Sequence, residues 1–409
     1  MAAAEKMLSM PDSESTLLPN LLHLRTLVRV ADNRTLTKAA KKMLRSTSVV
    51  HDGIDELERQ LGVSLFERAP GGWKITAQGS CVLSRARRIL AELAVLPAML
   101  GQPPVTVHEQ LYLLNARRLI AFIKLCQMKN MGRVAKSMAV TQPAISSAIK
   151  AMEAGTNTQL FERHGRGVRP TEIALAILPA IRRTVNELTH IARDLAALAG
   201  EVEGKVRIGA LPLSRTRIVP QAIACVIQAH PNVQVDTFEG SFEQLETDLR
   251  NGDLDLVFGA LRADEGSPLV TEALFDESLV IIARGNHPMR LAPHELHTLT
   301  DAQWVLPRSQ SPARDMIVKA FASHGMQPPI AKVESGDMAI IRGLLACTDL
   351  LAIVSSHQFE KDLASGELVV LDVTLPQTPR AIGIMTRKGA MHPPAVVAMI
   401  QALKEASLP

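Results

Sequence analysis

A short segment, residues 141–150, combines side chains that can hydrogen-bond to the edges of nucleic-acid bases. Gln142 can pair with adenine, and Ser146 and Ser147 can pair with several bases. Lys150 adds a positive charge close by. Three arginines follow further along the chain: Arg163, Arg166 and Arg169. Because arginine outside the major groove mostly contacts phosphates, these three suit positioning on a backbone better than sequence reading.

These side chains need a helix that holds them on one face. Thr141 is a good helix N-cap, and Pro143 is tolerated in a first helical turn because its missing N–H would be unpaired there. The spacing predicts a helix over Pro143–Glu153 with three apolar residues on its inner face: Ile145, Ile149 and Met152. A shorter helix, Gly132–Ser137, precedes it across a tight turn. The pair is typical of a helix-turn-helix, whose second helix can enter the major groove, and His164–Thr171 reads as a hairpin wing.

The same pattern occurs earlier in the chain. Leu65–Arg68 reads Leu-Phe-Glu-Arg and recurs as Leu160–Arg163, an offset of 95 residues, and the similarity extends to both sides without a gap. This predicts a duplication, with a first unit over residues 20–100 and a second over 110–200. The segment Gly101–Pro104 reads as the linker between them.

The first copy has diverged where the second carries its polar residues. Asp52 and Gly53 stand where the second copy has Ser147 and Ala148. A carboxylate is repelled by phosphates, and a glycine inside a helix costs up to about 1 kcal/mol, so we expect this unit to read bases poorly. It keeps basic residues that can neutralise phosphates: Lys38, Lys41, Lys42, Arg45, Arg68 and Lys74. The alternative is a degenerate copy kept for dimerisation or packing.

Residues 139–146, Leu160–Arg163 and 165–171 together resemble the winged helix-turn-helix of LysR-type transcriptional regulators. Thr156–Gln159 and Ile173-Ala174 depart from the family's usual residues without removing a DNA-facing side chain. The resemblance implies a double-stranded DNA operator, with RNA polymerase as a further partner. The residues assigned to DNA are Thr141, Gln142, Pro143, Ser146, Ser147, Lys150, Arg163, Arg166 and Arg169.

The resemblance also implies a long linker helix, for which Glu172–Leu198 has the apolar periodicity. An apolar stripe on one helix face needs an apolar partner. We expect the stripe to pair two chains into a homo-oligomer, a dimer or tetramer; the alternative is packing on the chain's own effector domain. The stripe consists of Ile177, Ile181, Val185, Leu188 and Leu195.

After residue 201 short apolar runs alternate with helical patterns, which favours α/β units on a parallel sheet. We expect a second lobe inserted over residues 288–365, after which the chain returns through 368–373 and 382–387. This order resembles the LysR effector domain, built like two-lobed periplasmic binding proteins. Phe258–Arg262, Val305–Pro307 with Pro312–Arg314, and Gly383–Arg387 resemble in particular the subgroup of galactose-binding-protein and protocatechuate-pathway regulators. The expected fold class is therefore multidomain: two α-rich winged helix-turn-helix domains, then a two-lobed α/β effector domain over 201–409.

Ligands of such folds lie beyond the carboxyl ends of the strands. The inducer residues predicted there are Ser214, Ser241 and Arg262 in the first lobe and Ser309, Ser311 and Arg314 in the second. Simple helix capping is the alternative for Ser214 and Ser241, and a salt bridge is the alternative for Arg262 and Arg314. We expect a small organic anion, an aromatic or sugar-derived acid, that controls catabolic or transport genes.

The distribution of charged residues also distinguishes the two halves of the chain. Residues 1–200 hold 27 Lys and Arg against 16 Asp and Glu, whereas residues 201–409 hold 18 against 25. A basic front half favours a polyanion partner. The four cysteines form no CxxC pair, and no membrane-spanning or export segment is evident, so we expect a cytoplasmic protein.

Enzyme readings find little support in the sequence. It lacks the G-x-S-x-G, P-loop and G-x-G-x-x-G motifs, and His294–His297 does not have the spacing of a metal site, so we expect no cofactor and no metal. The rival hypothesis is a solute-sensing protein whose front half mediates assembly. The intact segment around Gln142 favours DNA.

Overall fold

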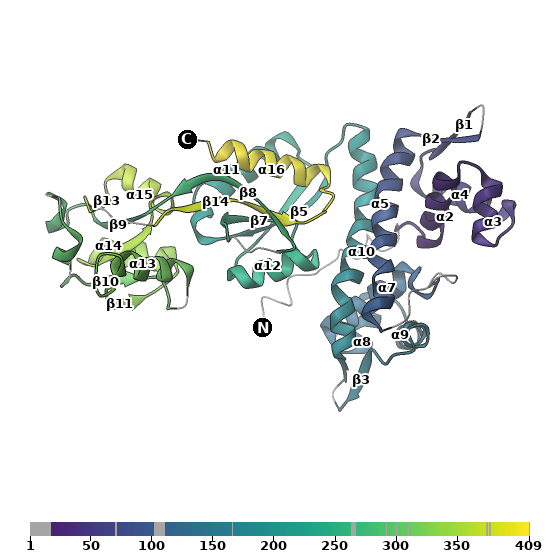
Figure 1. The fold of residues 1–409 in the computed structure, drawn as a ribbon, viewed down its shortest axis with the longest axis horizontal. Coiled ribbons are helices and arrows are strands. Elements are labelled where there is room, and N and C mark those ends of the chain that lie inside the picture. The colour runs from purple at the N-terminus through teal and green to yellow at the C-terminus, as the bar shows by residue number, and fades with distance from the viewer. Residues whose placement is uncertain are drawn as a thin grey trace. The chain divides into compact units, whose positions relative to one another are not determined.

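The structure is a computed structural model that describes residues 18–69, 72–101, 111–165, 167–262, 267–291, 293–299, 301–309, 311–373, 375 and 378–408. The chain divides into two compact units, Met1–Glu203 and Gly204–Pro409, which we describe separately (Figure 1). Of the expected linker between the repeats, residues 102–104 lie outside the described residues. No helix in the described part of the chain is long and apolar enough to cross a membrane.

The first unit contains one order of elements twice: three helices, a two-stranded antiparallel sheet and a long helix. The first repeat comprises α2 (Leu21–Asn33), α3 (Leu36–Met43), α4 (Thr47–Leu61), β1 (Phe66–Ala69), β2 (Gly72–Ile75), α5 (Ala77–Ala94) and the short α6 (Leu96–Met99). The second comprises η2 (Leu111–Leu113), α7 (Ala116–Met128), α8 (Met131–Ser137), α9 (Gln142–Thr156), β3 (Phe161–His164), β4 (Gly167–Pro170) and α10 (Glu172–Leu198). A shift of 95 residues carries α2, α4, β1 and β2 onto α7, α9, β3 and β4.

Each hairpin is tied to the end of the first helix of its repeat. The N–H of Val168 donates to the carbonyl of Lys129 at 2.9 Å, and the N–H of Trp73 donates to that of Arg34 at 3.5 Å. Gly167 makes this approach possible, because a Cβ there would lie 2.3 Å from the Lys129 oxygen and its φ of 151° disfavours other residues.

A glutamate anchors the start of each hairpin. Glu58 accepts hydrogen bonds from the N–H groups of Leu65 and Phe66 at 2.6 and 3.2 Å. Glu153 accepts from Leu160 and Phe161 at 2.9 and 3.1 Å. The carboxylate thus satisfies two backbone donors at the same point of each repeat.

The long helices α5 and α10 pack against each other, and the apolar residues of both repeats form one core. Ile177, Ile181, Val185 and Leu188 are buried in this core, and Leu195 packs against it. The expectation that this stripe awaits a second chain is therefore wrong. The first repeat supplies an apolar helix face that covers the stripe within the same unit.

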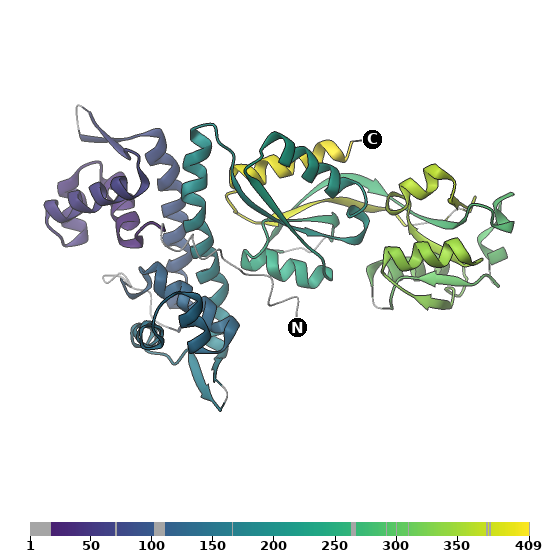
Figure 2. The ribbon, with the colours of Figure 1, turned by 180° about the vertical axis from the view of Figure 1, so that it is seen from behind.

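The second unit begins with a five-stranded sheet in the order β6-β5-β7-β14-β8. Its strands are β5 (Gly204–Ala210), β6 (Val233–Phe238), β7 (Leu256–Ala260), β8 (Leu269–Glu277) and β14 (Arg380–Arg387). The first three are parallel, but β14 runs antiparallel to β7 and β8, so the predicted parallel sheet is mixed. Helices α11 (Ile218–Ala229) and α16 (Pro394–Ala406) lie on one face and α12 (Phe242–Asn251) on the other (Figures 1 and 2).

A second five-stranded sheet has the order β11-β10-β12-β9-β13. Its strands are β9 (Leu279–Arg284), β10 (Trp304–Leu306), β11 (Ala331–Glu334), β12 (Leu351–Ser355) and β13 (Leu368–Val370). Its helices are α13 (Pro312–Ala322), α14 (Met338–Cys347) and α15 (Glu360–Ser365), with single turns η3 (Pro212–Ser214), η4 (Pro288–Leu291), η5 (Leu296–Leu299) and η6 (Ser356–Gln358) elsewhere in the unit.

The second lobe is therefore larger than residues 288–365. The run at 368–373 was expected to return to the first lobe, but its strand β13 pairs with β9 in the second sheet. One residue separates β8 from β9, so the chain passes directly from one sheet to the next. An apolar run indicates a strand but carries no signal for which sheet the strand joins.

Candidate nucleic-acid interface and candidate effector site

Helix α9 has the two faces that the sequence predicted. Ile145, Ile149 and Met152 are buried at 2%, 2% and 0% exposure. The opposite face is exposed at Thr141, Gln142, Pro143, Ser147 and Lys150 and half-buried at Ser146. Thr141 is the N-cap, but its hydroxyl makes no capping hydrogen bond. The face therefore offers hydroxyl, amide and ammonium groups to a ligand.

A tight turn holds α8 against α9. Ala139 adopts a left-handed conformation with φ of 52°, and the N–H of Val140 donates to the carbonyl of Ala135 at 3.0 Å. Val134 and Ala135 are buried, which fixes α8 on the core. The amino end of α9 carries the positive end of the helix dipole, which attracts phosphates.

The hairpin after α9 carries two exposed arginines. Arg163 on β3 lies opposite Val168, and Arg169 on β4 lies opposite Glu162. Arg166, the third predicted arginine, lies outside the described residues. The described part of the hairpin adds positive charge beside α9 on the same repeat.

The matching face of α4 in the first repeat differs in chemistry. His51 pairs with Asp55 at 2.9 Å and its ring meets the edge of Trp73 at 5.6 Å, so it is held by neighbours in its own repeat. Asp52 is exposed, and Val49 is 53% exposed. Two carboxylates, Asp52 and Asp55, thus lie where the second repeat has Ser147 and Lys150.

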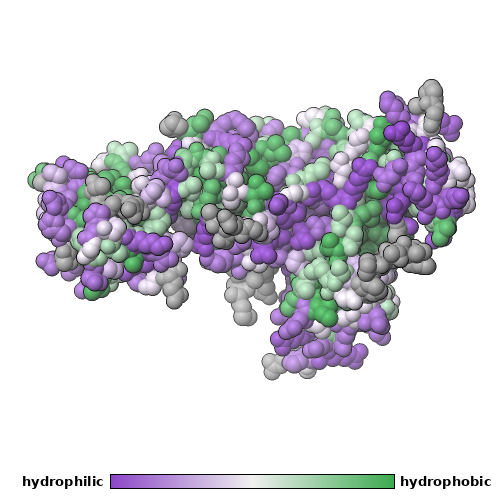
Figure 3. Space-filling model, in the orientation of Figure 1, coloured by the Kyte–Doolittle hydropathy of each residue, from purple (hydrophilic) through white to green (hydrophobic). Residues whose placement is uncertain are grey.

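Basic residues remain around that face. All six retained in the first repeat are exposed: Lys38, Lys41, Lys42, Arg45, Arg68 and Lys74. Lys74 pairs with Glu67 at 2.9 Å. Figure 3 shows the surface over α3 and α4 as mostly hydrophilic. This composition suits contact with phosphates better than reading of bases.

In the second unit, topology brings three predicted inducer residues to one sheet edge. Ser214, Ser241 and Arg262 follow β5, β6 and β7, which are adjacent and parallel. Ser214 is fully buried, and its hydroxyl donates to the carbonyl of Leu211 at 2.8 Å. Ser241 is the N-cap of α12, where its hydroxyl accepts from the N–H of Gln244 at 3.3 Å.

Arg262 already has an anionic neighbour. Its Nη1 lies 2.6 Å from Oε1 of Glu243, and its guanidinium lies 3.9 Å from the ring centre of Phe242. The hydrogen bond from Arg262 is the main cause that lowers the pKa of Glu243 to about 2. An incoming anion must therefore compete with this carboxylate.

The three residues of the second lobe follow β10 at its carboxyl end. The hydroxyl of Ser309 donates to Glu334 at 2.7 Å, which lowers the pKa of that carboxyl group, and Ser311 caps α13. Arg314 donates to the carbonyl of Pro329 at 3.4 Å. Its Nη1 is buried and finds no hydrogen-bond partner in the part of the chain that the structure describes.

The strand ends of the two lobes meet. Thr216, which follows β5, donates to the carbonyl of His357, which follows β12, at 3.2 Å. Arg217 pairs with Glu360 at 2.7 Å. The carboxyl edges of both sheets therefore contribute to one region of the second unit.

Arg215 was missing from the predicted set. It is half-buried, its Nε donates to the carbonyl of Ala210 at 2.8 Å, and burial lowers its pKa. Its position after β5, beside Ser214, could have indicated that it belongs to the candidate effector site. Nε2 of His294 lies 2.8 Å from the carbonyl of Met289, and Nδ1 of His297 lies 3.1 Å from Glu295.

Comparison with protein families matches both units. The model described as the LysR substrate binding domain matches residues 199–407. The model described as bacterial regulatory helix-turn-helix protein, lysR family, matches twice, over residues 21–80 and 116–175.

Relatives and solved structures agree with these matches. HTH-type transcriptional regulator GalR of Pseudomonas putida is 45% identical over 389 residues, 95% of this chain and 97% of that protein. PcaQ of Agrobacterium fabrum is 27% identical, over 71% of this chain and 94% of that protein. A full-length OxyR variant from Pseudomonas aeruginosa (TM-score 0.55, 22% identity, 71% of this chain and 97% of that one) shares the fold. So does full-length CbnR in complex with its target DNA (TM-score 0.52, 20% identity, 71% and 99%).

Proposed function

The chain belongs to the LysR family of transcriptional regulators, and from this premise we propose that its second repeat reads the base sequence of an operator. The observation that carries the proposal is the exposed polar face of α9 above a buried apolar face. Toward the major groove we assign Gln142, Ser146, Ser147 and Lys150, with Thr141 and Pro143 at the start of the same helix beside the DNA. Toward the backbone or minor groove we assign Arg163, Arg166 and Arg169.

In this proposal both repeats are winged helix-turn-helix domains, over residues 20–100 and 110–200, and residues 201–409 form the effector domain. The repeated element order and the two family-model matches support the assignment. The first repeat adds contacts to phosphates without sequence preference, because Asp52 and the paired His51 occupy its reading face.

Selection of genomic DNA fragments by the full chain tests the proposal. A shared sequence should emerge, and affinity should fall with salt by about 0.9 log units per log unit for each phosphate contact. Arg169→Ala should weaken all fragments alike, whereas Gln142→Ala should remove discrimination at a single base pair. Retention of all fragments with equal affinity by the wild type would contradict the proposal and favour a front half that mediates assembly.

For the second unit we propose a small organic anion as inducer, an aromatic or sugar-derived acid, held between the carboxyl edges of the two sheets. The support is the start of α12 at Ser241, the guanidinium of Arg262 and the buried unpaired Nη1 of Arg314. Ser214, Ser309 and Ser311 are the remaining candidates. Ser214 would need the surrounding structure to open, since it is fully buried.

Calorimetry on the full chain against a panel of acids and neutral sugars tests this site. Ser241→Ala and Arg262→Ala should weaken an acid that binds, while Glu243→Gln should strengthen it by removing the competing carboxylate. Tight binding of a neutral sugar, unchanged in all three variants, would place the pocket elsewhere. A ligand can shift the protein only if it binds one lobe arrangement better than another, so contacts from both lobes are required.

The proposal includes a homo-oligomer, contact with RNA polymerase, a cytoplasmic location and control of catabolic or transport genes. Because the α10 stripe is covered within the chain, chain–chain contacts must use another surface. Light scattering of the full chain tests the oligomer directly.

A further inference from the structure

Helices α5 and α10 meet through equivalent faces. The offset of 95 residues that relates the repeats also pairs the buried positions of the two helices. The buried pairs are Val82 and Ile177, Ala86 and Ile181, Ile89 and Thr184, and Leu93 and Leu188. A contact in which two equivalent surfaces cover each other has the symmetry of a two-fold interface.

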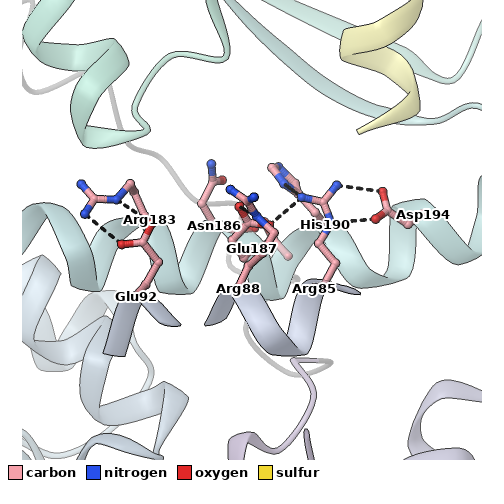
Figure 4. Close-up of polar contacts among 9 residues, drawn as sticks. Arg85, Arg88, Glu92, Arg183, Asn186, Glu187, His190 and Asp194 are labelled. Atoms are coloured by element: carbon pink, nitrogen blue, oxygen red, sulfur yellow. Dashed lines mark hydrogen bonds and ion pairs between the residues drawn. The ribbon is translucent and has the colours of Figure 1, made fainter. Parts of the chain in front are cut away.

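The ion pairs across the contact are reciprocal as well. Nε of Arg88 lies 3.0 Å from Oε1 of Glu187, and Nη2 of Arg183 lies 2.9 Å from Oε2 of Glu92. The same offset of 95 residues converts one pair into the other (Figure 4). Since residue numbers rise on α5 while those of their partners fall on α10, the helices are antiparallel.

A buried network around Arg85 breaks this symmetry. Arg85 is fully buried and donates from Nη1 to Glu187 at 2.6 Å and from Nε to Asp194 at 2.7 Å. Asp194 is itself only 7% exposed. The equivalents of Arg85 and Asp194 in the other repeat are Ala180 and Met99, so this network has no reciprocal copy.

We propose that α5 and α10 form an intramolecular equivalent of a dimer interface, which Arg85 restricts to unlike helices, so that one chain presents two unequal DNA-binding repeats to one non-palindromic operator. The DNA part of this inference rests on the proposed function; the pairing part does not. The second repeat takes the sequence-specific half of the operator, and the first takes adjoining phosphates.

Two copies of the same helix, from two chains, would form a less stable contact than α5 with α10. Two α10 helices from different chains would bury Asp194 twice with no counterpart of Arg85, and an unpaired buried carboxylate is strongly disfavoured. Glu187 would keep one ion pair, with Arg183 of the other chain. Two α5 helices would bury Arg85 twice without Asp194. The charges therefore select the contact that forms within one chain.

The placement of the hairpins fits a bipartite reader. The β1–β2 and β3–β4 hairpins lie toward opposite ends of the α5–α10 pair (Figures 1 and 2). Two-fold related helix-turn-helix units contact half-sites about one helical turn apart, roughly 10 base pairs, or a multiple of it.

The pairing part is tested by giving α10 its own arginine. With Ala180→Arg, α10 carries a guanidinium as well as Glu187 and Asp194, so two α10 helices from different chains can form the charged network with each other. Association between chains, measured by sedimentation, should therefore tighten roughly tenfold or more over wild type. Ala180→Leu adds bulk without charge and is the matched control, expected not to tighten it. Equal association of both variants would overturn the role of charge in the pairing.

The operator part is tested on a DNA fragment selected by the wild-type chain. Mass photometry with hydroxyl-radical footprinting should find one chain for each pair of neighbouring protected segments, and only one segment of the pair should be sensitive to base substitution. Arg85→Ala should lose protection of the insensitive segment, whereas Arg87→Ala, an exposed neighbour paired with Asp32, should keep both.

Two chains, each covering one segment of a palindrome with equal base sensitivity, would overturn the inference. If Arg85→Ala does not fold, the wild-type footprint and chain count still decide. Failure to select any specific DNA would contradict the proposed function, while the sedimentation result would still decide the pairing.

Discussion

The two repeats of the first unit share a scaffold and differ in the surface that α4 and α9 present. Glu58 and Glu153 accept the same pair of backbone hydrogen bonds, and both hairpins are tied to the carbonyl at the end of the first helix. On the exposed faces, Asp52 in the first repeat stands where Ser147 stands in the second. The hydrogen bonds inside the repeat are therefore kept while the exposed face of its third helix differs.

Buried and exposed positions of the repeats are under different constraints. Buried positions must keep filling the core that the repeats share, because cavities and unpaired polar groups cost several kcal/mol each. Substitutions at exposed positions cost little stability, so these positions are free to change with the function of each repeat.

Arg85→Ala should destabilise the first unit by about 3–5 kcal/mol, because it leaves Asp194 buried without its guanidinium and Glu187 with Arg88 alone. Hydrogen exchange of α5 and α10 amides across a urea series measures the change. Arg87→Ala on the same helix is exposed and should cost at most about 1 kcal/mol. A loss for Arg85→Ala no larger than for Arg87→Ala would show that the network contributes little.

Glu58→Ala and Glu153→Ala should each cost about 2–3 kcal/mol, since each leaves two backbone N–H groups without an acceptor. The two losses should be similar, measured by the same exchange experiment on each hairpin. Glu162→Ala, an exposed glutamate of the Leu-Phe-Glu-Arg segment, is the control and should change little. A large loss in only one repeat would show that the scaffolds are not equivalent.

Ser147→Asp places on α9 the carboxylate that α4 carries. DNA affinity should fall by about 1–2 kcal/mol through repulsion from phosphates, measured by fluorescence anisotropy at fixed salt. Ser147→Asn has the same shape without the charge and should lose less. Equal losses for the two variants would mean that shape and not charge decides.

Asp52→Ser is the reverse change, and we expect it to have the smallest effect on DNA affinity. Non-specific DNA affinity should rise by about 0.5 kcal/mol or less, because Asp52 is exposed and screened. The sequence preference should not change. A new preference appearing in Asp52→Ser would show that the first repeat retains a reading face and is silenced by one charge.

Local rules predicted most of the first unit. The bounds expected for α10 match the structure, and the inner residues of α9 were found from their spacing alone. The repeat offset located both hairpins. What covers the α10 stripe was not predictable in this way, because the covering helix belongs to the other repeat and no local pattern links Arg85 to Asp194 across 109 residues.

The second unit shows the same limit. Strands were found from apolar runs, but the assignment of β13 to the second sheet depends on its pairing with β9. The sequence placed Ser214, Ser241 and Arg262 at strand ends, where the structure has them. Their neighbours, such as Glu243 beside Arg262, decide how they act and were not in the pattern.

The central claim is that the second repeat reads sequence and the first does not. A mutant cycle between protein variants and operator base pairs tests it most directly. For the wild type, substitution of one base pair should cost about 1–3 kcal/mol. Gln142→Ala should abolish that difference, and His51→Ala should retain it. If His51→Ala abolished the discrimination while Gln142→Ala retained it, the roles of the two repeats would be reversed.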